Sequence, residues 1–510
     1  MRAPLAAAAL LLAILAPAAE ARICAPDTKG PCNDTGFVRL KGPVPPLSHE
    51  GRFFTDATGR VAFLHGFNMV YKVGSYRPED TGFGRDDARF LRRHGFNTIR
   101  LGVIYKGLEP EPPGADGTPR YEVEYLRSIA RSERILARHR IHTLLDFHQD
   151  LYNERFEGEG WPDWQVFDDG LPAEPKNGFP ANYVGMPALS RAFDHFWAND
   201  PALGVGLQDR FADAWRVVAQ RFRDRPYVMG YDLLNEPWPG SQSPSCFNTE
   251  GCPAFDMGPL SEFSIRVIER IRGVDAETLV FWEPNVVFDF GAKTSHLDTG
   301  DANAGLSFHN YCLPGAVGGS GGQSCEELEE LVFDNADAAA ERTGDVPFLT
   351  ENAATDDLEI NERQARLADE HMVSWQTWHY CDCQDPTTAG PGIQSTVIDP
   401  SRPPRGDNVK RQKLAVLSRP YPQAVAGTPE GFSFDPETRR FELRYSTQMV
   451  GGGGFHNGET EVFVPPIHYH GEYKVATKGA RVVSKPGRRV LRLRSEPGAR
   501  TVTVKVAPAG

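Results

Sequence analysis

The stretch "GYDLLNEPWPG" (residues 230–240) contains a predicted core strand that ends on polar residues. Its first half is a short apolar run of the kind that forms a buried strand. An amide and a carboxylate, Asn235 and Glu236, follow it, and Pro237 then ends the strand because proline has no N–H to donate. A strand that leaves the core on two polar side chains indicates a functional edge of a sheet.

Seven other runs repeat this design, a short β-rich stretch with a polar residue at its end. With 228–236, the predicted strands are 62–71, 97–103, 142–148, 278–284, 305–311, 346–351 and 374–380. Helix-like stretches lie between them, so the strands should be parallel, and eight such units fit a closed (β/α)₈ TIM barrel of the α/β class. The rival is an open doubly wound sheet, which usually begins with a glycine-rich nucleotide turn. The chain has no GxGxxG or P-loop motif.

In such a barrel, the side chains at the C-terminal strand ends converge on one mouth. All eight predicted strands end on polar or aromatic residues. In chain order these are Asn68 and Lys72, Arg100, His148 and Asp150, Asn235 and Glu236, Glu283 and Asn285, His309 and Tyr311, Glu351, and Trp378. Burying so many polar groups is costly unless they are paired, which favours a site. The alternative is a set of hydrogen-bonded structural polar groups.

Two of these residues, Glu236 and Glu351, are carboxylates on the fourth and seventh strands. Glycosidic bond cleavage requires two facing carboxyl groups: one protonates the leaving oxygen, and the other attacks the anomeric carbon or activates a water. The acid needs a raised pKa, which a neighbouring carboxylate and partial burial supply. We expect Arg100 to keep the nucleophile ionised, Tyr311 to donate to it, and Asn235 to bind a sugar hydroxyl.

Glu283 of "FWEPN" (281–285) is an alternative acid. It lacks the preceding asparagine and lies one strand further from the usual partner of strand seven. We therefore interpret Glu283 as a subsite or structural residue.

Four motifs carry a resemblance to a known family: "NTIRL" (97–101), "FHQD" (147–150), "NEPW" (235–238) and "LTEN" (349–352). In this order they resemble the retaining glycoside hydrolases of family five, over most of residues 60–380. The resemblance implies a (β/α)₈ barrel, with Glu236 as acid/base and Glu351 as nucleophile, and it implies no metal or organic cofactor. The other characteristic positions of the family fall on Arg100, His148, Asn235, His309, Tyr311 and Trp378.

Within this family the chain is most similar to the endoglycoceramidases, which cleave whole glycans from ceramide. "HGFNMVYK" (65–72), "LLDFHQD" (144–150) and "NEPWPG" (235–240), with an added C-terminal β-domain, carry this resemblance. It implies that Lys72 and Asp150 contact the glucose nearest ceramide. Trp197 of "DHFWAND" (194–200) is the candidate for a tryptophan that lines the site.

An insertion of about 80 residues between the third and fourth strands supports an amphiphilic substrate, because it is far longer than a usual βα connection. Its aromatic residues are Trp161, Trp164, Phe167, Phe179, Tyr183, Phe193, Phe196 and Trp197. Such side chains stack on sugars or form an apolar groove for acyl chains. The alternative is that they pack the insertion onto the barrel, and we expect about half of them to do only that.

After about residue 420 the pattern changes to alternating strands broken by Gly and Pro, which predicts a small β-sandwich. Residues 421–510 hold 13 Lys and Arg against 8 Asp and Glu, although the whole chain has a net charge of −13. The simpler interpretation of the basic excess is an ordinary solvated surface, and the other is a face that meets an anionic substrate surface. The predicted parts are a signal peptide (1–21), an N-terminal extension (22–50), the catalytic barrel (51–418) and the sandwich (425–510).

The first 21 residues read as a secretory signal, with an early arginine, an apolar run and a small-x-small cleavage site, so we expect a secreted protein. Eight cysteines in an exported chain favour disulfides. Cys24–Cys32 and Cys246–Cys252 are close enough for local pairs, and the other four cysteines could pair in several ways. The tract "HYCDC" (379–383) could instead suggest metal binding, but the chain has no CxxC motif that would supply further ligands.

The residues and the resemblance together predict a secreted, retaining endo-β-glycosidase that acts on glycosphingolipids at a membrane or micelle surface. The acidic chain argues against a nucleic-acid partner, and nothing implies an obligate protein partner. One alternative is a β-glucanase, mannanase or β-glucosidase of the same fold. The other is a catalytically dead, carbohydrate-binding barrel, against which the presence of both carboxylates speaks.

Overall fold

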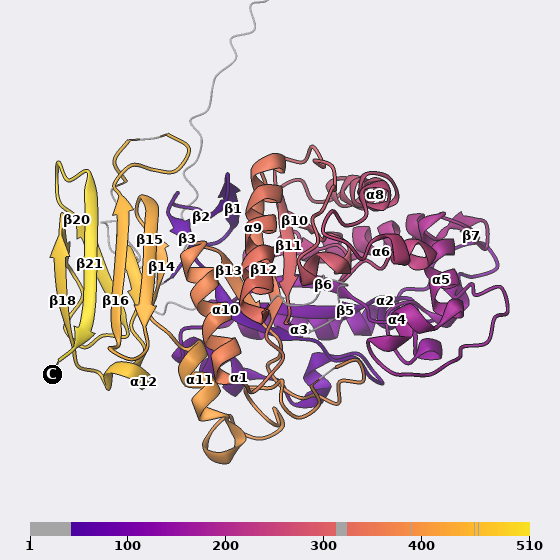
Figure 1. Ribbon diagram of the computed structural model, residues 1–510, viewed down its shortest axis with the longest axis horizontal. Helices are drawn as coiled ribbons and strands as arrows, with labels where there is room; N and C mark the ends of the chain where they lie inside the picture. The colour runs from indigo at the N-terminus through magenta and orange to yellow at the C-terminus, as the bar shows by residue number, and fades with distance from the viewer. Residues whose placement is uncertain (1–41, 313–323, 389, 453, 457, 510) are drawn as a thin grey trace, which may run out of the picture. The chain divides into compact units, whose positions relative to one another are not determined.

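The computed structural model describes residues 42–312, 324–388, 390–452, 454–456 and 458–509 (Figure 1). The predicted signal peptide lies outside the described residues, as does most of the N-terminal extension with Cys24 and Cys32. Within the described part of the chain, no helix has the length and apolar character needed to cross a bilayer.

Eight parallel strands form a closed barrel, which confirms the predicted fold class. In chain order they are β4 (His65–Met69), β5 (Thr98–Ile104), β6 (His142–His148), β9 (Val228–Asp232), β10 (Leu279–Trp282), β11 (Ala304–Asn310), β12 (Val346–Asn352) and β13 (Ser374–Thr377). Each overlaps one of the predicted runs, and β13 pairs with β4 to close the barrel.

Long helices follow most of the strands and cover the barrel. They are α1 (Arg85–Arg93), α3 (Val123–Arg138), α6 (Leu207–Phe222), α8 (Ser261–Arg272), α9 (Cys325–Thr343) and α10 (Leu358–Glu370), with the shorter α11 (Arg411–Leu417) after β13. α6 shows why they form: Leu207, Phe211, Trp215, Val218 and Phe222 recur at helical spacing and are all buried. Between β10 and β11 there is only the short η6 (Val286–Phe290).

The N-terminal end of the barrel, which we call the floor, is filled by apolar side chains. Phe54 of β2 (Phe53–Asp56) packs on Phe281 and Phe348, with ring centroids 6.1 and 5.3 Å apart. Leu144 and Met229 belong to the same buried cluster. An aromatic plug from outside the barrel therefore closes its floor.

Two antiparallel sheets form the C-terminal domain, as predicted for a sandwich. One holds β15 (Thr428–Asp435), β16 (Arg440–Ser446), β21 (Thr501–Pro508) and β18 (Tyr473–Lys478). The other holds β14 (Tyr421–Val425), β17 (Thr460–Phe463), β20 (Val490–Ser495) and β19 (Ala480–Val482), and it continues into β3 (Val61–Ala62), β2 and β1 (Leu47–Glu50).

The pairing of β3 with β14, with Ala62 opposite Ala424, joins the start of the chain to its end. Residues 51–62 were expected to belong to the barrel, whereas their strands pair with the C-terminal sheet. Strands this short become stable only by joining a larger sheet, and sequence alone does not show which sheet offers the edge.

Three disulfides lie in the described residues: Cys246–Cys252, Cys312–Cys325 and Cys381–Cys383. The first confirms the predicted local pair. The other two pair the four remaining cysteines, for which the sequence allowed several pairings.

Candidate active site

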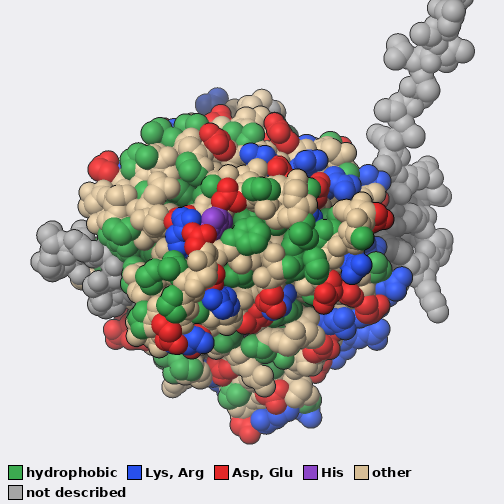
Figure 2. Space-filling view, turned by 90° about the vertical axis from the view of Figure 1, so that its right-hand side faces the viewer, with side chains coloured by type: hydrophobic (Ala, Val, Ile, Leu, Met, Phe, Trp, Pro, Cys, Tyr) green, Lys and Arg blue, Asp and Glu red, His purple; other side chains and the backbone are tan. Residues whose placement is uncertain are grey.

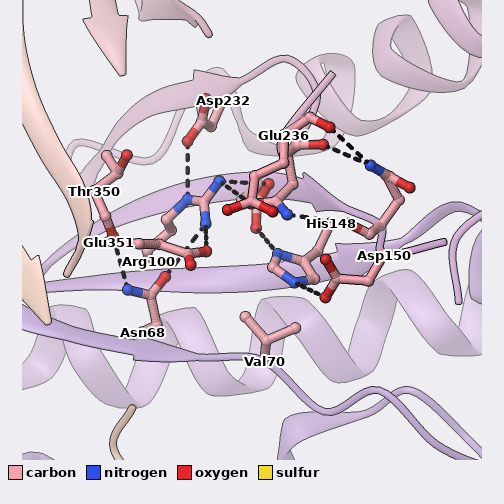
Figure 3. Close-up of polar contacts among 12 residues, drawn as sticks. Asn68, Val70, Arg100, His148, Asp150, Asp232, Glu236, Thr350 and Glu351 are labelled. Atoms are coloured by element: carbon pink, nitrogen blue, oxygen red, sulfur yellow. Dashed lines mark hydrogen bonds and ion pairs between the residues drawn. The ribbon is translucent and has the colours of Figure 1, made fainter. Parts of the chain in front are cut away.

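The polar ends of the barrel strands converge on a buried arginine at the mouth, the C-terminal end of the barrel (Figure 3). The Arg100 guanidinium is fully buried, and its Nε donates to Asp232 Oδ2 at 2.8 Å. Nη1 donates to Glu351 Oε1 at 2.5 Å, and Nη2 donates to Asn235 Oδ1 at 3.0 Å and to Glu283 Oε1 at 2.8 Å. A buried cation of this kind is stable only when its donors are satisfied by anionic and polar acceptors, as they are here.

Glu351, at the end of β12, accepts hydrogen bonds from two of the predicted residues. Besides the Arg100 bond, Tyr311 Oη donates to its Oε2 at 2.7 Å. A register shift in β11 between Phe308 and His309 sets His309 opposite Glu351. The structure therefore places a guanidinium N–H and a phenol O–H as hydrogen-bond donors on the two oxygens of this carboxylate.

Glu236 lies just beyond β9 in a left-handed backbone conformation, with φ of +43°, which is uncommon for a residue with a side chain. Its backbone N–H donates to Glu283 Oε2 at 2.8 Å, and the Gln149 side-chain amide donates to the carbonyl oxygens of Asn235 and Glu236 at 2.9 and 3.1 Å. These bonds hold the unusual turn in place and aim the Glu236 side chain into the mouth.

Burial, and after it the nearby Asp150 carboxylate, raise the pKa of Glu236 from the usual 4.5 to about 7. Its Oε1 lies 2.9 Å from His309 Nδ1. Burial lowers the pKa of His309 to about 4, so this imidazole is neutral at pH 7. Glu236 can therefore hold a proton near neutral pH, which a general acid requires.

The two carboxyl groups face one another across a short gap. One carboxylate oxygen of Glu236, one of Glu351 and one ring nitrogen of His309 all lie within 4.8 Å of each other. Retaining glycosidases hold their carboxyl groups about 5–5.5 Å apart, whereas inverting enzymes need about 6.5–9.5 Å to accommodate a water. The spacing in this structure fits direct attack by one carboxylate.

A second charged cluster surrounds Lys72 beside this pair. Lys72 Nζ lies 2.6 Å from Asp150 Oδ2 and 3.2 Å from Asp385 Oδ1, and it donates to Thr387 Oγ1 at 2.8 Å. The ammonium also sits 4.4 Å from the centre of the Trp378 ring. Burial alone would lower the pKa of Lys72, but the surrounding carboxylates outweigh it and raise that pKa well above its usual value.

His148 links the two clusters. Its Nδ1 lies 2.8 Å from Asp146 Oδ2, its Nε2 lies 3.5 Å from Asp150 Oδ2, and its ring stacks on Trp378 at 5.4 Å. Burial would lower the pKa of His148, yet the Asp146 carboxylate raises it to about 10. His148 is therefore a cation that stabilises the Asp150 carboxylate beside it.

Trp197, predicted to line the site, makes its contacts elsewhere. It is on α5 (Pro187–Trp197), where its indole N–H donates to the carbonyl of Trp238 at 2.7 Å and its ring packs edge-on against Phe255 and Phe263. These are the contacts of a packing residue, which is the alternative role given above for the aromatic residues of the insertion. Its role as a substrate contact stays a prediction.

Several residues of the site were not found from the sequence. Asp146 and Asp232 bind Arg100 from within β6 and β9, at 3.1 and 2.8 Å. The alternation of inward-facing residues along β6, two before His148, could have found Asp146. Asp385, Thr387 and the buried Glu159 lie in long loops, where no periodic signal exists.

Among the residues that the structure describes, three groups of side chains have metal-ligand spacing, but their donors already have partners. In His379, Cys381 and Cys383 the two cysteines are joined as a disulfide. In the group with His148, Asp150 and Glu159, the Lys72 ammonium supplies the cation. In the group with Glu236, His309 and Glu351, the Arg100 guanidinium supplies the cation by pairing with Glu351. We assign no metal to these groups.

Comparison with known proteins gives two family matches. Residues 56–384 match the model described as cellulase, glycosyl hydrolase family 5, and residues 419–506 match the glycoside hydrolase family 5 C-terminal domain. The chain is 32% identical over 482 residues to endoglycoceramidase I of Rhodococcus hoagii, covering 92% of this chain and 89% of that protein. It is 29% identical over 465 residues to an endoglycoceramidase of Hydra vulgaris, covering 84% and 82%.

Solved structures agree with these matches. Endo-glycoceramidase II from Rhodococcus sp., solved as a lactosyl-enzyme intermediate, superimposes with a TM-score of 0.71 at 27% identity and covers 89% of this chain and 99% of that one. The same enzyme solved with ganglioside GM3 gives a TM-score of 0.69 at 27% identity, with the same coverage.

Proposed function

The chain belongs to glycoside hydrolase family 5, and from that premise we propose that it is a retaining endo-β-glycosidase that hydrolyses the bond between oligosaccharide and ceramide in glycosphingolipids. The observation that carries this proposal is the pair Glu236 and Glu351, with oxygens within 4.8 Å and opposite environments. One carboxyl group is buried with a pKa raised to about 7, and the other accepts from an arginine and a tyrosine.

These environments divide the roles. A Glu351 oxygen attacks the anomeric carbon while the Glu236 proton passes to the ceramide oxygen, so that the glycosidic bond breaks and a glycosyl-enzyme forms. Glu236, now deprotonated, takes a proton from water, and the resulting hydroxide displaces Glu351 from the sugar. Arg100 and Tyr311 stabilise the Glu351 carboxylate when it is released.

The second cluster supports recognition of the sugar next to the ceramide. Lys72 and Asp150 are charged, buried groups beside the carboxylate pair, and Trp378 offers a ring face over the Lys72 ammonium. Fixed donors and acceptors next to an aromatic face suit a sugar ring. Asn235, held by Arg100, is the donor proposed for the hydroxyl next to the reacting carbon.

The substrate class is supported by the relatives, whose names describe endoglycoceramidases, and by the Rhodococcus structure solved with ganglioside GM3. We further propose that the protein is secreted after removal of residues 1–21 and meets its substrate at a membrane or micelle surface.

Incubation with a ganglioside in detergent tests the activity: intact oligosaccharide and ceramide are expected. Release of single monosaccharides, or turnover only on β-glucans or mannans, would favour the other family 5 activities. Sugar binding without any product would favour a catalytically dead barrel.

A further inference from the structure

Large hydrophobic side chains are exposed mainly on one end of the barrel. Among the described residues ten are exposed, and six of these lie between the C-terminal end of a barrel strand and the helix that next covers the barrel: Val184, Leu203, Val205, Met257, Ile393 and Ile398. Such connections lie on the mouth side in this fold. Apolar groups that gather around a functional opening indicate an interaction surface.

The most exposed of these side chains is at the tip of a hairpin. β7 (Pro201–Ala202) and β8 (Val205–Gly206) pair antiparallel, and the two residues between them, Leu203 and Gly204, have φ of +51° and +82°. A two-residue turn with positive φ at both positions favours Asn and Gly. Leu203 occupies such a position with 68% of its surface exposed, which local conformational preference does not explain.

The hairpin is held firmly against the body of the barrel. The nearly buried Arg210 donates from Nε to the carbonyl of Ala202 at 2.9 Å and from Nη2 to that of Leu203 at 3.4 Å, and its guanidinium sits 5.1 Å from the Trp164 ring centre. A Cβ added to Gly206 would lie only 2.2 Å from Asn199 Oδ1, so the Gly206 backbone packs closely against the Asn199 side chain. Leu203 is therefore presented on a rigid support.

The charges around the hairpin indicate which partner suits it. Residues 199–206 contain no Lys or Arg and one carboxylate, Asp200. The neighbouring Asp209 is paired with Arg266 at 2.7 Å. A surface without basic residues does not attract anionic headgroups, and burying its apolar side chains in an apolar phase is favourable.

We infer that the β7–β8 hairpin inserts Leu203 and Val205 into the apolar layer of the lipid aggregate that carries the substrate, and so docks the mouth on that surface. The inference rests on the proposed function, because a ceramide-linked substrate lies in such an aggregate. Figure 2, which looks onto the end that carries α4 (Ala181–Gly185), α5 and β7 in Figure 1, shows hydrophobic side chains in several groups across this face.

The test compares wild type with Leu203→Asn/Val205→Thr, which gives the turn a residue that accepts positive φ. Binding to phosphatidylcholine vesicles, measured by co-sedimentation, should fall about fivefold or more, and turnover of glycosphingolipid in those vesicles should fall with it. Turnover of a water-soluble aryl β-glycoside and the unfolding midpoint should stay unchanged or rise. Val482→Thr, an equally small change at an exposed valine of the C-terminal domain, is the matched control and should bind as wild type does.

Unchanged vesicle binding in the double variant would overturn the inference, as would an equal loss in the Val482→Thr control. Binding only to vesicles that contain phosphatidylserine, abolished by 0.5 M salt, would also overturn it in favour of an electrostatic contact. If wild type cleaves no glycosphingolipid, the proposed function fails, but vesicle binding still decides the role of the hairpin.

Discussion

The floor and the mouth of the barrel are built from the same strands, yet they hold opposite kinds of side chain. β6 contributes Leu144 to the floor and His148 to the mouth, and β12 contributes Phe348 to the floor and Glu351 to the mouth. In the floor cluster, the side chains that pack together are all apolar. At the mouth, buried charges are held in place by one another. Each strand thus serves stability at one end and chemistry at the other. Substitutions at the floor should therefore lower the free energy of unfolding, and substitutions at the mouth should lower kcat.

Glu351→Gln, a substitution at the mouth, should cause the largest loss of activity. Glutamine keeps the shape and an acceptor for Arg100 but cannot form the glycosyl-enzyme, so kcat should fall by about 10⁴-fold or more. The measurement is turnover of a ganglioside, with circular dichroism as the control for folding. A folded variant with undiminished turnover would contradict the assignment of the nucleophile.

Glu236→Ala should cost about 10²–10⁴-fold in kcat on glycosphingolipid, because ceramide leaves as a poor alkoxide without a proton. The loss should be much smaller for an aryl β-glycoside whose phenolate leaves without protonation. Rates on the two substrates give the comparison. Equal losses on both would show that Glu236 is not the acid.

Phe54→Ala should act at the floor alone. Removing a buried ring that packs on Phe281 and Phe348 should lower the free energy of unfolding by about 3–4 kcal/mol. The kcat of the folded enzyme at 20 °C should stay as in wild type. Denaturant unfolding and steady-state kinetics check both parts, with Phe54→Leu as the milder control. A loss of kcat with little loss of stability would contradict the assignment of stability to the floor and chemistry to the mouth.

Glu236→Gln should show the smallest effect and the opposite sign, a gain in stability at alkaline pH. The pKa of Glu236 is about 7 in the folded protein and 4.5 when unperturbed, so the folded state binds the extra proton between these values. Its contribution to stability is therefore full below pH 4.5 and is lost as the pH rises through 7. The variant should unfold at a temperature about 2 °C higher than wild type at pH 8.5 and show no such gain at pH 4.5. The same difference at both pH values would contradict the raised pKa.

The barrel could be predicted because its eight strands are marked twice, by short apolar runs and by the polar residues that end them. The pair Glu236 and Glu351 followed from position, since both end strands of one barrel. Glu283 shows the limit of this reasoning. In the structure it accepts from Arg100 and from the backbone N–H of Glu236, so it holds the turn that carries the proposed acid, a role that depends on side-chain direction.

Other parts of the site lie where sequence carries no periodic signal. Asp385 and Thr387 reach Lys72 from the loop after β13, and their approach depends on the path of that loop. The aromatic side chain of Trp197 suits a sugar-binding residue, and in the structure its ring packs on Phe255 and Phe263. A contact of Trp197 with the substrate stays a prediction.

The pairing of β3 with β14 has a consequence for how the chain is made. β3 is synthesised early, and its neighbour in the sheet follows about 360 residues later. At about 5–20 residues per second, the first strands wait roughly 20–70 s on the ribosome before their sheet can be completed. Phe54, the plug of the floor, belongs to this waiting segment. The sheet edge at β3 is thus covered only when the last domain emerges, so a chain cut at residue 420 should leave that strand edge bare.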